Sequence, residues 1–477
     1  MEKRRSSNRR PLPKLNTESF INVRSFITAL LIIFALMVFT YVLTFLVPGG
    51  EFARIEDASG NLIIDTDVGY RSVEGGIPFW RWLLSPILVL GSSDSVTLIA
   101  VIVFLLVIGG IFSALNSCGL MRYMLKRIVQ RFGKSRYTLM AVVVLFFMAM
   151  GSFIGSFEEC VPLVPIVTAM AVSLGWDALT GLSMILLAAG SGFAAGVFNP
   201  FTIGVAQTLA GLPMFSGAGL RALSFVLIYA LLLSFIRHHA KKVDRGVDTV
   251  ELLRDFQRER NMDRGLTVFA SILGAGILIV LSSSVITAIQ DYTLIIVAVM
   301  FLVAGIIAAR TAGMSRAELW KKFLSGVKDI SPAVIMILMA SSVKYTLVES
   351  KILDTLLLYA VSLVSVVPKT VVILIIYLVV LVMNFFVASG SAKAFLLIPL
   401  IMPIAQLFGV SPQLCIVAYA FGDGFSNVFY PTNPVLLISL GLTDTSYGEW
   451  AGWTWKFQLM NILLTGGILM LGLAIGY

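Results

Sequence analysis

Residues 385–434 read FFVASGSAKAFLLIPLIMPIAQLFGVSPQLCIVAYAFGDGFSNVFYPTNP, and this stretch decides the fold. It is overwhelmingly apolar, yet it carries Lys393 and Asp423, each beside a glycine-rich break. An ionisable side chain at lipid depth costs several kcal/mol unless it faces the protein interior or water, so such residues mark functional sites. The stretch therefore predicts membrane-embedded segments that meet at a polar site.

The composition indicates an integral membrane protein. Of 477 residues, 58% are hydrophobic and only 13% are charged, whereas charged residues make up about a quarter of a soluble domain. Several uncharged runs, among them 96–121 and 178–220, reach or exceed the roughly 20 residues that a spanning helix needs. The three cysteines lie in apolar surroundings and are odd in number, so we predict core residues and no disulfide framework.

The positive charge follows the membrane flanks. The net charge is +9, and the basic residues cluster beside apolar runs, as they do on the cytoplasmic side of membrane proteins. This pattern argues against nucleic-acid binding. It predicts that the basic tail, residues 1–25, is cytoplasmic and that Phe26–Val47 is the first span, too long for a signal-peptide core.

We expect an all-α polytopic membrane protein with about nine transmembrane helices. Residues 51–94 hold seven acids against three arginines, which predicts an external loop with a β-hairpin about Ser59-Gly60-Asn61 and an interfacial helix over Pro78–Leu90. The predicted regions are 1–25 (cytoplasmic tail), 26–95 (first helix and external loop), 96–240 (first repeat), 241–329 (central cytoplasmic loop and connecting helices) and 330–477 (second repeat).

Two segments predict re-entrant hairpins. In residues 137–175, apolar sequence meets Glu158 and Glu159 and continues at once as a second apolar run. Two full crossings compete with one hairpin here, and we favour the hairpin because no loop separates the two runs. The second hairpin spans residues 369–410, around the turn SGSAKA.

The two regions share a pattern in the same order. Leu163-Val164-Pro165-Ile166 aligns with Leu397-Ile398-Pro399-Leu400, and Gly190-Ser191-Gly192-Phe193 aligns with Gly422-Asp423-Gly424-Phe425. Each region then reads as a crossing, an amphipathic helix, a hairpin, a broken helix and a crossing. The basic flanks orient the two regions oppositely, which predicts an inverted repeat with its binding site near the bilayer midplane.

Other boundaries follow from the same patterns. In 178–220 we expect a helix to about Ala189, an unwound segment to Pro200 and a shorter helix beyond it. Later spans are predicted over Ile330–Val348 and Phe457–Tyr477. His238 and His239 close a basic flank without carboxylate or cysteine company, so we predict no metal site there.

Four motifs resemble a known family: FGDGFSNVFYPT, NFFVASGSAKAFLLIPLIMPIAQLFGV, GSFEECVPLVPI and AGVFNPFTIGVAQTLAGLP. They are similar to the YfcC-like branch of the DcuC (C4-dicarboxylate carrier) family, within the wider ion-transporter superfamily. The resemblance covers nearly everything after about Arg24. It implies a secondary carrier with two opposed hairpins and two unwound helices, commonly dimeric, that works by an elevator motion.

The family resemblance implies transport more firmly than it implies a substrate. The same branch contains ArcD-type arginine/ornithine exchangers, and other relatives carry succinate-like diacids or short fatty acids. Sodium-coupled dicarboxylate relatives carry a Ser-Asn-Thr turn at the hairpin tips, whereas the tips here read GSFEE and SGSAK. Their sodium and carboxylate ligands therefore cannot be transferred residue by residue.

The predicted substrate-binding residues are charged or polar and lie at the tips or breaks: Ser156, Glu158, Glu159, Asn199, Ser389, Ser391, Lys393, Asp423, Asn427 and Asn433, with Ser191 and Lys344 as secondary candidates. Opposite charges at matched tips would hold a zwitterion, Lys393 facing a carboxylate and the glutamates facing a cation. Alternatively, Lys393 pairs internally with Asp423 or a glutamate and holds the repeats in register. The two glutamates also suit a helix start, and Lys344 would also suit snorkelling.

Together with these residues, the family resemblance implies a transporter of small amino acids, basic ones such as arginine and ornithine favoured, by antiport or ion-coupled symport. A C4-dicarboxylate or other small organic anion carrier is the alternative. An intramembrane protease lacks a second aspartate at the depth of Asp423, and a channel suits paired hairpins less well than an occluding site. We expect no cofactor or metal, H+ or Na+ as coupling ion, a homodimer, and a bacterial cytoplasmic membrane with the N-terminus inside.

Overall fold

The computed structural model describes residues 23–56, 62–65, 68–92, 95–155, 157–213, 215–246, 258–282, 293–365, 371–443 and 445–477. Helices dominate these residues, and the few strands are three residues long. The chain is an all-α polytopic membrane protein, as its composition predicts. Seven described helices are long and apolar enough to cross a membrane, and four shorter apolar helices accompany them.

The first part of the chain contains a long helix, a small β lobe and a run of interrupted helices. Its elements are α1 (Val23–Leu46), β1 (Gly50–Phe52), β2 (Arg54–Glu56), β3 (Leu62–Ile64), β4 (Tyr70–Ser72), α2 (Phe79–Leu83), α3 (Ser85–Leu88), η1 (Val89–Gly91), α4 (Ser95–Ser117), α5 (Leu120–Phe132), α6 (Arg136–Ala149), η2 (Met150–Ile154), η3 (Glu158–Leu163), α7 (Val164–Ser173), α8 (Ala178–Leu182), η4 (Ser183–Leu187), α9 (Ala188–Ala195), η5 (Pro200–Gly204), α10 (Val205–Leu209) and α11 (Ala218–Val243).

From residue 260 onward, all regular elements of the described chain are helices. They are α13 (Arg260–Ser282), α14 (Thr293–Thr311), α15 (Arg316–Glu349), α16 (Leu353–Ser365), α17 (Val372–Phe386), α18 (Gly390–Leu407), α19 (Pro412–Gly424), η7 (Phe425–Val428), α20 (Pro434–Gly441) and α21 (Tyr447–Ala474).

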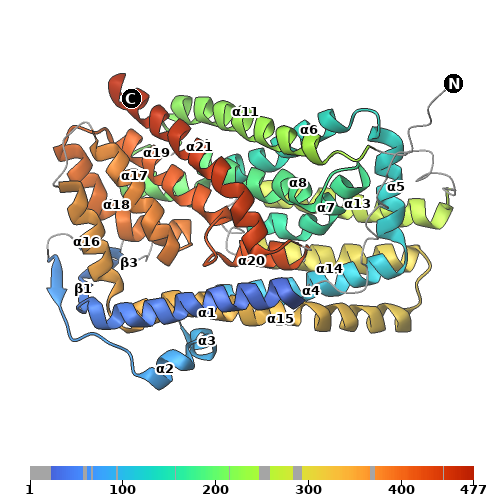
Figure 1. The fold of residues 1–477 in the computed structure, drawn as a ribbon, viewed down its shortest axis with the longest axis horizontal. Helices are drawn as coiled ribbons and strands as arrows, with labels where there is room; N and C mark the ends of the chain where they lie inside the picture. The colour runs from blue at the N-terminus through green and yellow to red at the C-terminus, as the bar shows by residue number, and fades with distance from the viewer. Residues whose placement is uncertain are drawn as a thin grey trace, which may run out of the picture.

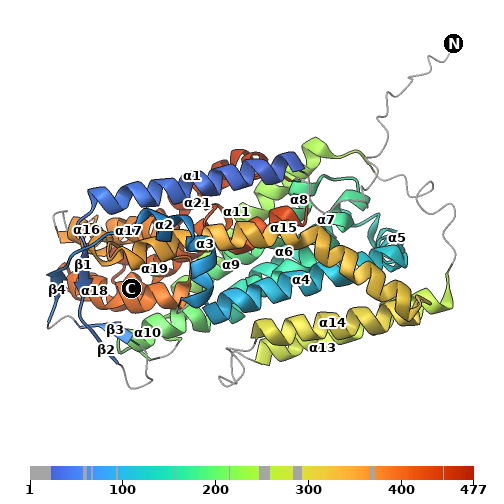
Figure 2. The same ribbon diagram turned by 90° about the horizontal axis from the view of Figure 1, so that it is seen from below.

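The β lobe and the basic helix α5 lie at opposite ends of the molecule. In Figures 1 and 2 the strands sit at the left end and α5 at the right, and α1 and α15 run lengthwise between them. Helices α13 and α14 form a pair that lies alongside α4 (Figure 2). Helices α9 and α19 pack against each other in the interior, and the side chains of both are almost all buried.

The predicted β-hairpin is confirmed in its strands. β2 pairs antiparallel with β3, and β1 pairs with β4 outside them; the predicted turn, residues 59–61, lies outside the described residues. Arg54 Nη2 lies 2.8 Å from Asp354 Oδ1, and the Phe52 amide donates to Asp354 Oδ2 at 2.9 Å. These bonds fasten the lobe to the first turn of α16. The predicted interfacial helix is split into α2, α3 and η1.

Two helices begin well before their predicted spans. Helix α15 starts at Arg316 and α21 at Tyr447, whereas apolar length predicted spans from Ile330 and Phe457. Each start is a Ser-x-x-Glu sequence in which the serine side chain accepts a hydrogen bond from the glutamate amide, at 3.2 Å in both. This cap stabilises polar turns that precede the apolar run, so residue 330 falls inside a helix and not at its start.

The broken helix of the first half stays helical further than predicted. It continues to Ala195, and only Gly196–Asn199 separates it from η5. Glycines permit this because they let the backbone approach its neighbour: a Cβ on Gly192 would lie 1.9 Å from the Met148 carbonyl oxygen. The Gly190-Ser191-Gly192 sequence therefore marks a close helix crossing and not the break itself.

Candidate functional site

A buried ion pair joins the turn of the second hairpin to α19. Lys393 Nζ is 2.6 Å from Asp423 Oδ1, and the two side chains are 1% and 0% exposed. Lys393 lies in the first turn of α18, and a helical side chain leans toward the N-terminus of its helix. Its ammonium group therefore reaches back to the hairpin turn, where it also donates to the Val387 carbonyl at 3.1 Å and to Asn384 Oδ1.

Asn384 connects this pair to the break after α19. Its Nδ2 lies within hydrogen-bonding distance of the Asp423 carbonyl (3.0 Å), Ser426 Oγ (2.7 Å) and Asn427 Oδ1 (3.0 Å). Asn433 Nδ2 also donates to Asn427 Oδ1, at 3.0 Å. The network joins α17, α18, α19 and the start of α20, and every member is buried. The hydrogen bonds of this network link the four elements at the break and favour one arrangement of their backbones.

The helices that follow the two breaks, η5 and α20, start with the same two residues. Asn199-Pro200 opens η5 and Asn433-Pro434 opens α20. Asn199 Oδ1 accepts from the Phe201 amide and Asn433 Oδ1 accepts from the Val435 amide, each at 2.9 Å. Asparagine at the cap and proline next to it favour a helix start even in the protein interior. The two predicted asparagines therefore position the backbone at the breaks.

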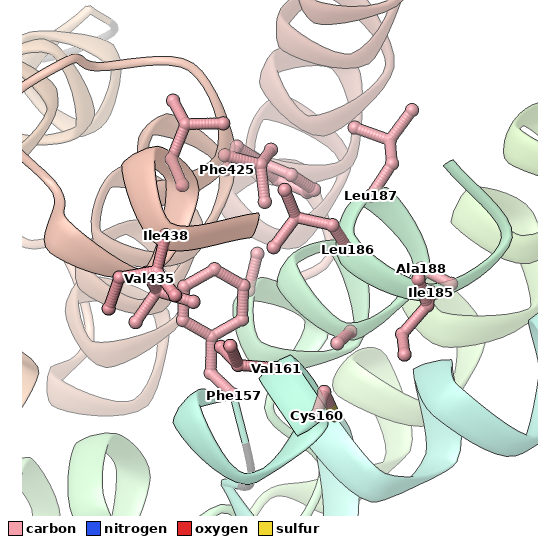
Figure 3. Close-up of a cluster of buried hydrophobic side chains, with 14 of the residues drawn as sticks. Phe157, Cys160, Val161, Ile185, Leu186, Leu187, Ala188, Phe425, Val435 and Ile438 are labelled. Carbon is pink, nitrogen blue, oxygen red and sulfur yellow. The ribbon is translucent and has the colours of Figure 1, made fainter. Parts of the chain in front are cut away.

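Two glutamates without an ion pair to any described residue lie at the tip of the first hairpin. Glu158 is exposed and Glu159 half-buried at the start of η3, and neither forms an ion pair with a described residue. Their neighbours Phe157, Cys160 and Val161 are buried. Figure 3 shows Phe157 and Val161 beside Val435 of the second half, and η3 packs against α20.

The second-half tip packs against the first half in turn. Helix α18 contacts η5 and α10. A Cβ on Gly390 would lie 2.6 Å from Asp423 Oδ2 and 2.8 Å from Thr202 Cγ2, so both side chains border this glycine. Asp423 Oδ2 and Thr202 Oγ1 are buried and have no hydrogen-bond partner among the described residues. Two buried polar atoms from opposite halves thus lack a hydrogen-bond partner among the described residues.

The remaining predicted residues occupy varied positions. Ser389 is exposed and caps α18, accepting from the Ala392 amide at 3.4 Å, and Ser391 is half-buried. Ser191 is buried in α9, and its hydroxyl has no partner among the described residues. Lys344 is half-buried on α15, which packs against α20. Ser156 lies outside the described residues.

Arg221 is a buried charge that the sequence interpretation missed. Its guanidinium donates to the carbonyls of Val197, Phe215 and Ser216 at 3.0–3.3 Å, and Nη1 has no partner among the described residues. Val197 lies in the first-half break. The available signal was that Arg221 is the only charged residue between Asp177 and Arg237, but it was treated as the boundary of an apolar run.

His239 joins three helices at the end of α11. Its Nε2 lies 2.8 Å from Asp177 Oδ2, and Trp453 Nε1 donates to its Nδ1 at 3.0 Å. Because Nδ1 accepts, the ring proton lies on Nε2 and faces the aspartate. Burial acts to raise the pKa of Asp177, but hydrogen bonds from His239 and Thr180 outweigh it and lower that pKa. Among the described residues, no three His, Cys, Asp or Glu side chains gather as metal ligands.

Comparisons with known proteins place these features among transporters. Residues 26–475 match the family described as DcuC, C4-dicarboxylate anaerobic carrier. The protein named "Putative basic amino acid antiporter YfcC" of Escherichia coli (strain K12) is 29% identical over 377 residues, 74% of this chain and 73% of that protein. An uncharacterized protein of Haemophilus influenzae is 26% identical over 385 residues, 78% of this chain and 74% of that protein.

Two solved structures are similar over most of their length. The YdaH transporter of Alcanivorax borkumensis has a TM-score of 0.42 at 18% identity, covering 95% of this chain and 99% of that one. MtrF of Neisseria gonorrhoeae has a TM-score of 0.43 at 14% identity, covering 93% and 94%. The family match extends over nearly the whole chain.

Proposed function

The chain belongs to the DcuC family, and from this premise we propose that it is a secondary transporter of small amino acids that favours basic ones such as arginine and ornithine. Membership makes the protein a membrane transporter of a small molecule and not an enzyme. The proposal concerns the substrate, the mode of transport and the residues that bind. The name of the Escherichia coli relative, a basic amino acid antiporter, agrees with it.

The charge balance of the two tips carries the substrate proposal. Lys393 is neutralised by Asp423 at 2.6 Å. Glu158 and Glu159 have no cationic partner among the described residues, so the excess charge of the two tips themselves is negative. A negative site attracts a guanidinium or ammonium group and repels a second carboxylate.

The polar atoms beside Gly390 suit the rest of an amino acid. Asp423 Oδ2 accepts hydrogen bonds and Thr202 Oγ1 both donates and accepts, and both lack partners among the described residues. Ser389 and Ser391 lie at the open N-terminal turn of α18, where backbone amides favour a carboxylate. We assign the substrate's α-carboxylate to this turn and its cationic end to the glutamates.

The packing of the tips supports the proposed mode of transport. Each tip lies against the resumed helix of the other half, η3 against α20 and α18 against η5 and α10. Withdrawal of one tip would open the site to one side while the other tip keeps it closed. We therefore propose an inverted repeat with hairpins 137–175 and 369–410, working by an elevator motion as antiporter or as H+- or Na+-coupled symporter.

The remaining features of the proposal concern the protein's setting. Basic residues on α5 and the start of α13 lie at one end of the molecule and the β lobe at the other (Figures 1 and 2). By the positive-inside rule this basic end is proposed to be cytoplasmic, in a bacterial membrane, and the basic composition of residues 1–25 supports a cytoplasmic N-terminus. A homodimer is proposed from the family resemblance.

A C4-dicarboxylate carrier is the second candidate. The family description favours it, and so does Arg221, whose buried guanidinium contacts carbonyl groups beside the first-half break. A guanidinium with an unpartnered Nη1 is a natural carboxylate ligand.

Counterflow into proteoliposomes separates the two candidates. Vesicles loaded with arginine, ornithine, a neutral amino acid, succinate or fumarate are tested for uptake of labelled substrate from the same panel. We expect exchange with arginine and ornithine, and none with the diacids. Exchange with diacids alone would refute the amino-acid proposal and favour the second candidate. Ohmic single-channel current from the purified protein would refute alternating access.

A further inference from the structure

The Lys393 ammonium lies inside a cage of three oxygen atoms. The ligands are Asp423 Oδ1 at 2.6 Å, the Val387 carbonyl at 3.1 Å and Asn384 Oδ1. An ammonium group has three N–H donors, so this cage satisfies all of them. A carboxylate, an amide oxygen and a backbone carbonyl are also the oxygen donors that proteins offer to hard metal cations.

Each oxygen is held in place by an element other than α18. Asn384 and Val387 belong to the last turn and the C-cap of α17, where the helix dipole favours a cation. Asn384 is fixed by its Nδ2 contacts with the Asp423 carbonyl and Ser426 Oγ. Asp423 comes from α19 and is fully buried. The cage is therefore built by α17 and α19, and α18 only inserts the cation into it.

We infer that Lys393 is a covalently attached substitute for a coupling cation. Its ammonium group occupies a site that binds Na+ when the lysine side chain is absent. The wild-type protein then needs no Na+ for exchange, because the cation is covalently attached. Removing the lysine side chain leaves the oxygen cage open to Na+. The consequence for exchange rests on the proposed transport function, but the consequence for ion binding does not.

The test measures Na+ binding without any substrate. Purified wild type, Lys393→Ala, Lys393→Met and the double variant Lys393→Ala/Asp423→Asn are unfolded thermally in NaCl and in choline chloride of equal ionic strength. We expect Na+ to raise the Tm of Lys393→Ala by several degrees, since a ligand that binds only the folded state stabilises it. The other three proteins should show no difference between the two salts, because methionine fills the cage and the double variant lacks its carboxylate.

Two outcomes overturn the inference. One is a Lys393→Ala protein with the same Tm in both salts, or one that aggregates in both while Lys393→Met folds. The other is a wild-type protein whose counterflow stops when choline replaces Na+. Exchange of diacids in place of amino acids would refute the proposed substrate and leave the Na+ result standing, so the two failures are distinguishable.

Discussion

The two hairpin tips, one with Glu158 and Glu159 and the other with Lys393, differ in whether their charges have a partner. At the second-half tip, Lys393 is buried and compensated by Asp423 and two further oxygens. At the first-half tip, Glu158 is exposed, Glu159 is half-buried, and neither forms an ion pair with a described residue. A charge can be held away from water only when a partner replaces its hydration.

This difference distinguishes a charge that stabilises the fold from charges that could contact a ligand. Breaking the buried pair leaves an uncompensated charge inside the protein, so the pair supports the fold. Glu158 is exposed and Glu159 is half-buried, so we expect their loss to affect the fold less than loss of the buried pair. The following variants test this division, from the largest expected effect to the smallest.

Asp423→Asn should have the largest effect on stability. It leaves the Lys393 ammonium without a counter-charge, so we expect the free energy of unfolding to fall by about 3–5 kcal/mol and transport to be lost. Denaturant unfolding in detergent measures the first and counterflow the second. The control Asp423→Asn/Lys393→Met removes both charges and should regain most of the stability without transport. A single variant as stable as wild type would mean that the pair does not support the fold.

Glu158→Gln should affect the ligand and not the fold. The unfolding free energy should change by no more than about 0.5 kcal/mol. The apparent affinity for arginine should fall about tenfold or more, since a hydrogen bond to a charged group contributes about 1.5–3 kcal/mol, and neutral substrates should lose less. Competition in counterflow measures both, with Glu259→Gln, an exposed acid at the start of α13, as control. Equal losses for arginine and neutral substrates would contradict the proposed role.

Gly390→Ala should disturb the contact between the second-half tip and the first half. The new methyl group would lie 2.6 Å from Asp423 Oδ2 and 2.8 Å from Thr202 Cγ2, so we expect a loss of about 1–3 kcal/mol of stability and slower exchange. Gly448→Ala is the matched control: its Cβ meets no atom within 4 Å, and α21 should gain up to about 1 kcal/mol. If both variants behave alike, the tip does not pack as tightly as the structure indicates.

Thr202→Val should have the smallest effect on stability. Its hydroxyl has no partner among the described residues, so we expect a change within about 0.5 kcal/mol, together with weaker substrate binding. Ser426→Ala, which loses the 2.7 Å contact with Asn384 Nδ2, should lose about 1 kcal/mol. Thermal unfolding compares the two. A larger loss for Thr202→Val would indicate that its hydroxyl already has a partner in the folded protein.

Local patterns predicted the elements well. Apolar length gave α1 and the class of the protein, and strand propensity gave the β2–β3 hairpin. The Gly- and Pro-containing segments located both breaks within a few residues. Helix starts were predicted less well, because the Ser315 and Ser446 caps lie in polar sequence that hydropathy does not register.

The sequence by itself identified most of the charges that lie among apolar segments, all but Arg221 of those described above, because the free energy of an ionisable side chain among apolar residues is a local property. Only the tertiary structure decided their partners. Lys393 meets Asp423 across 30 positions and Asn384 meets Asn427 across 43, and Arg221 meets the carbonyl of Val197. These pairings depend on where α17, α18 and α19 cross. The crossing points are determined by the packing of the helices and not by their composition. For the same reason, the sequence alone did not distinguish Lys393 from Glu158 and Glu159 in whether each has a partner. The fold pairs Lys393 with Asp423 and gives the glutamates no ion pair with a described residue.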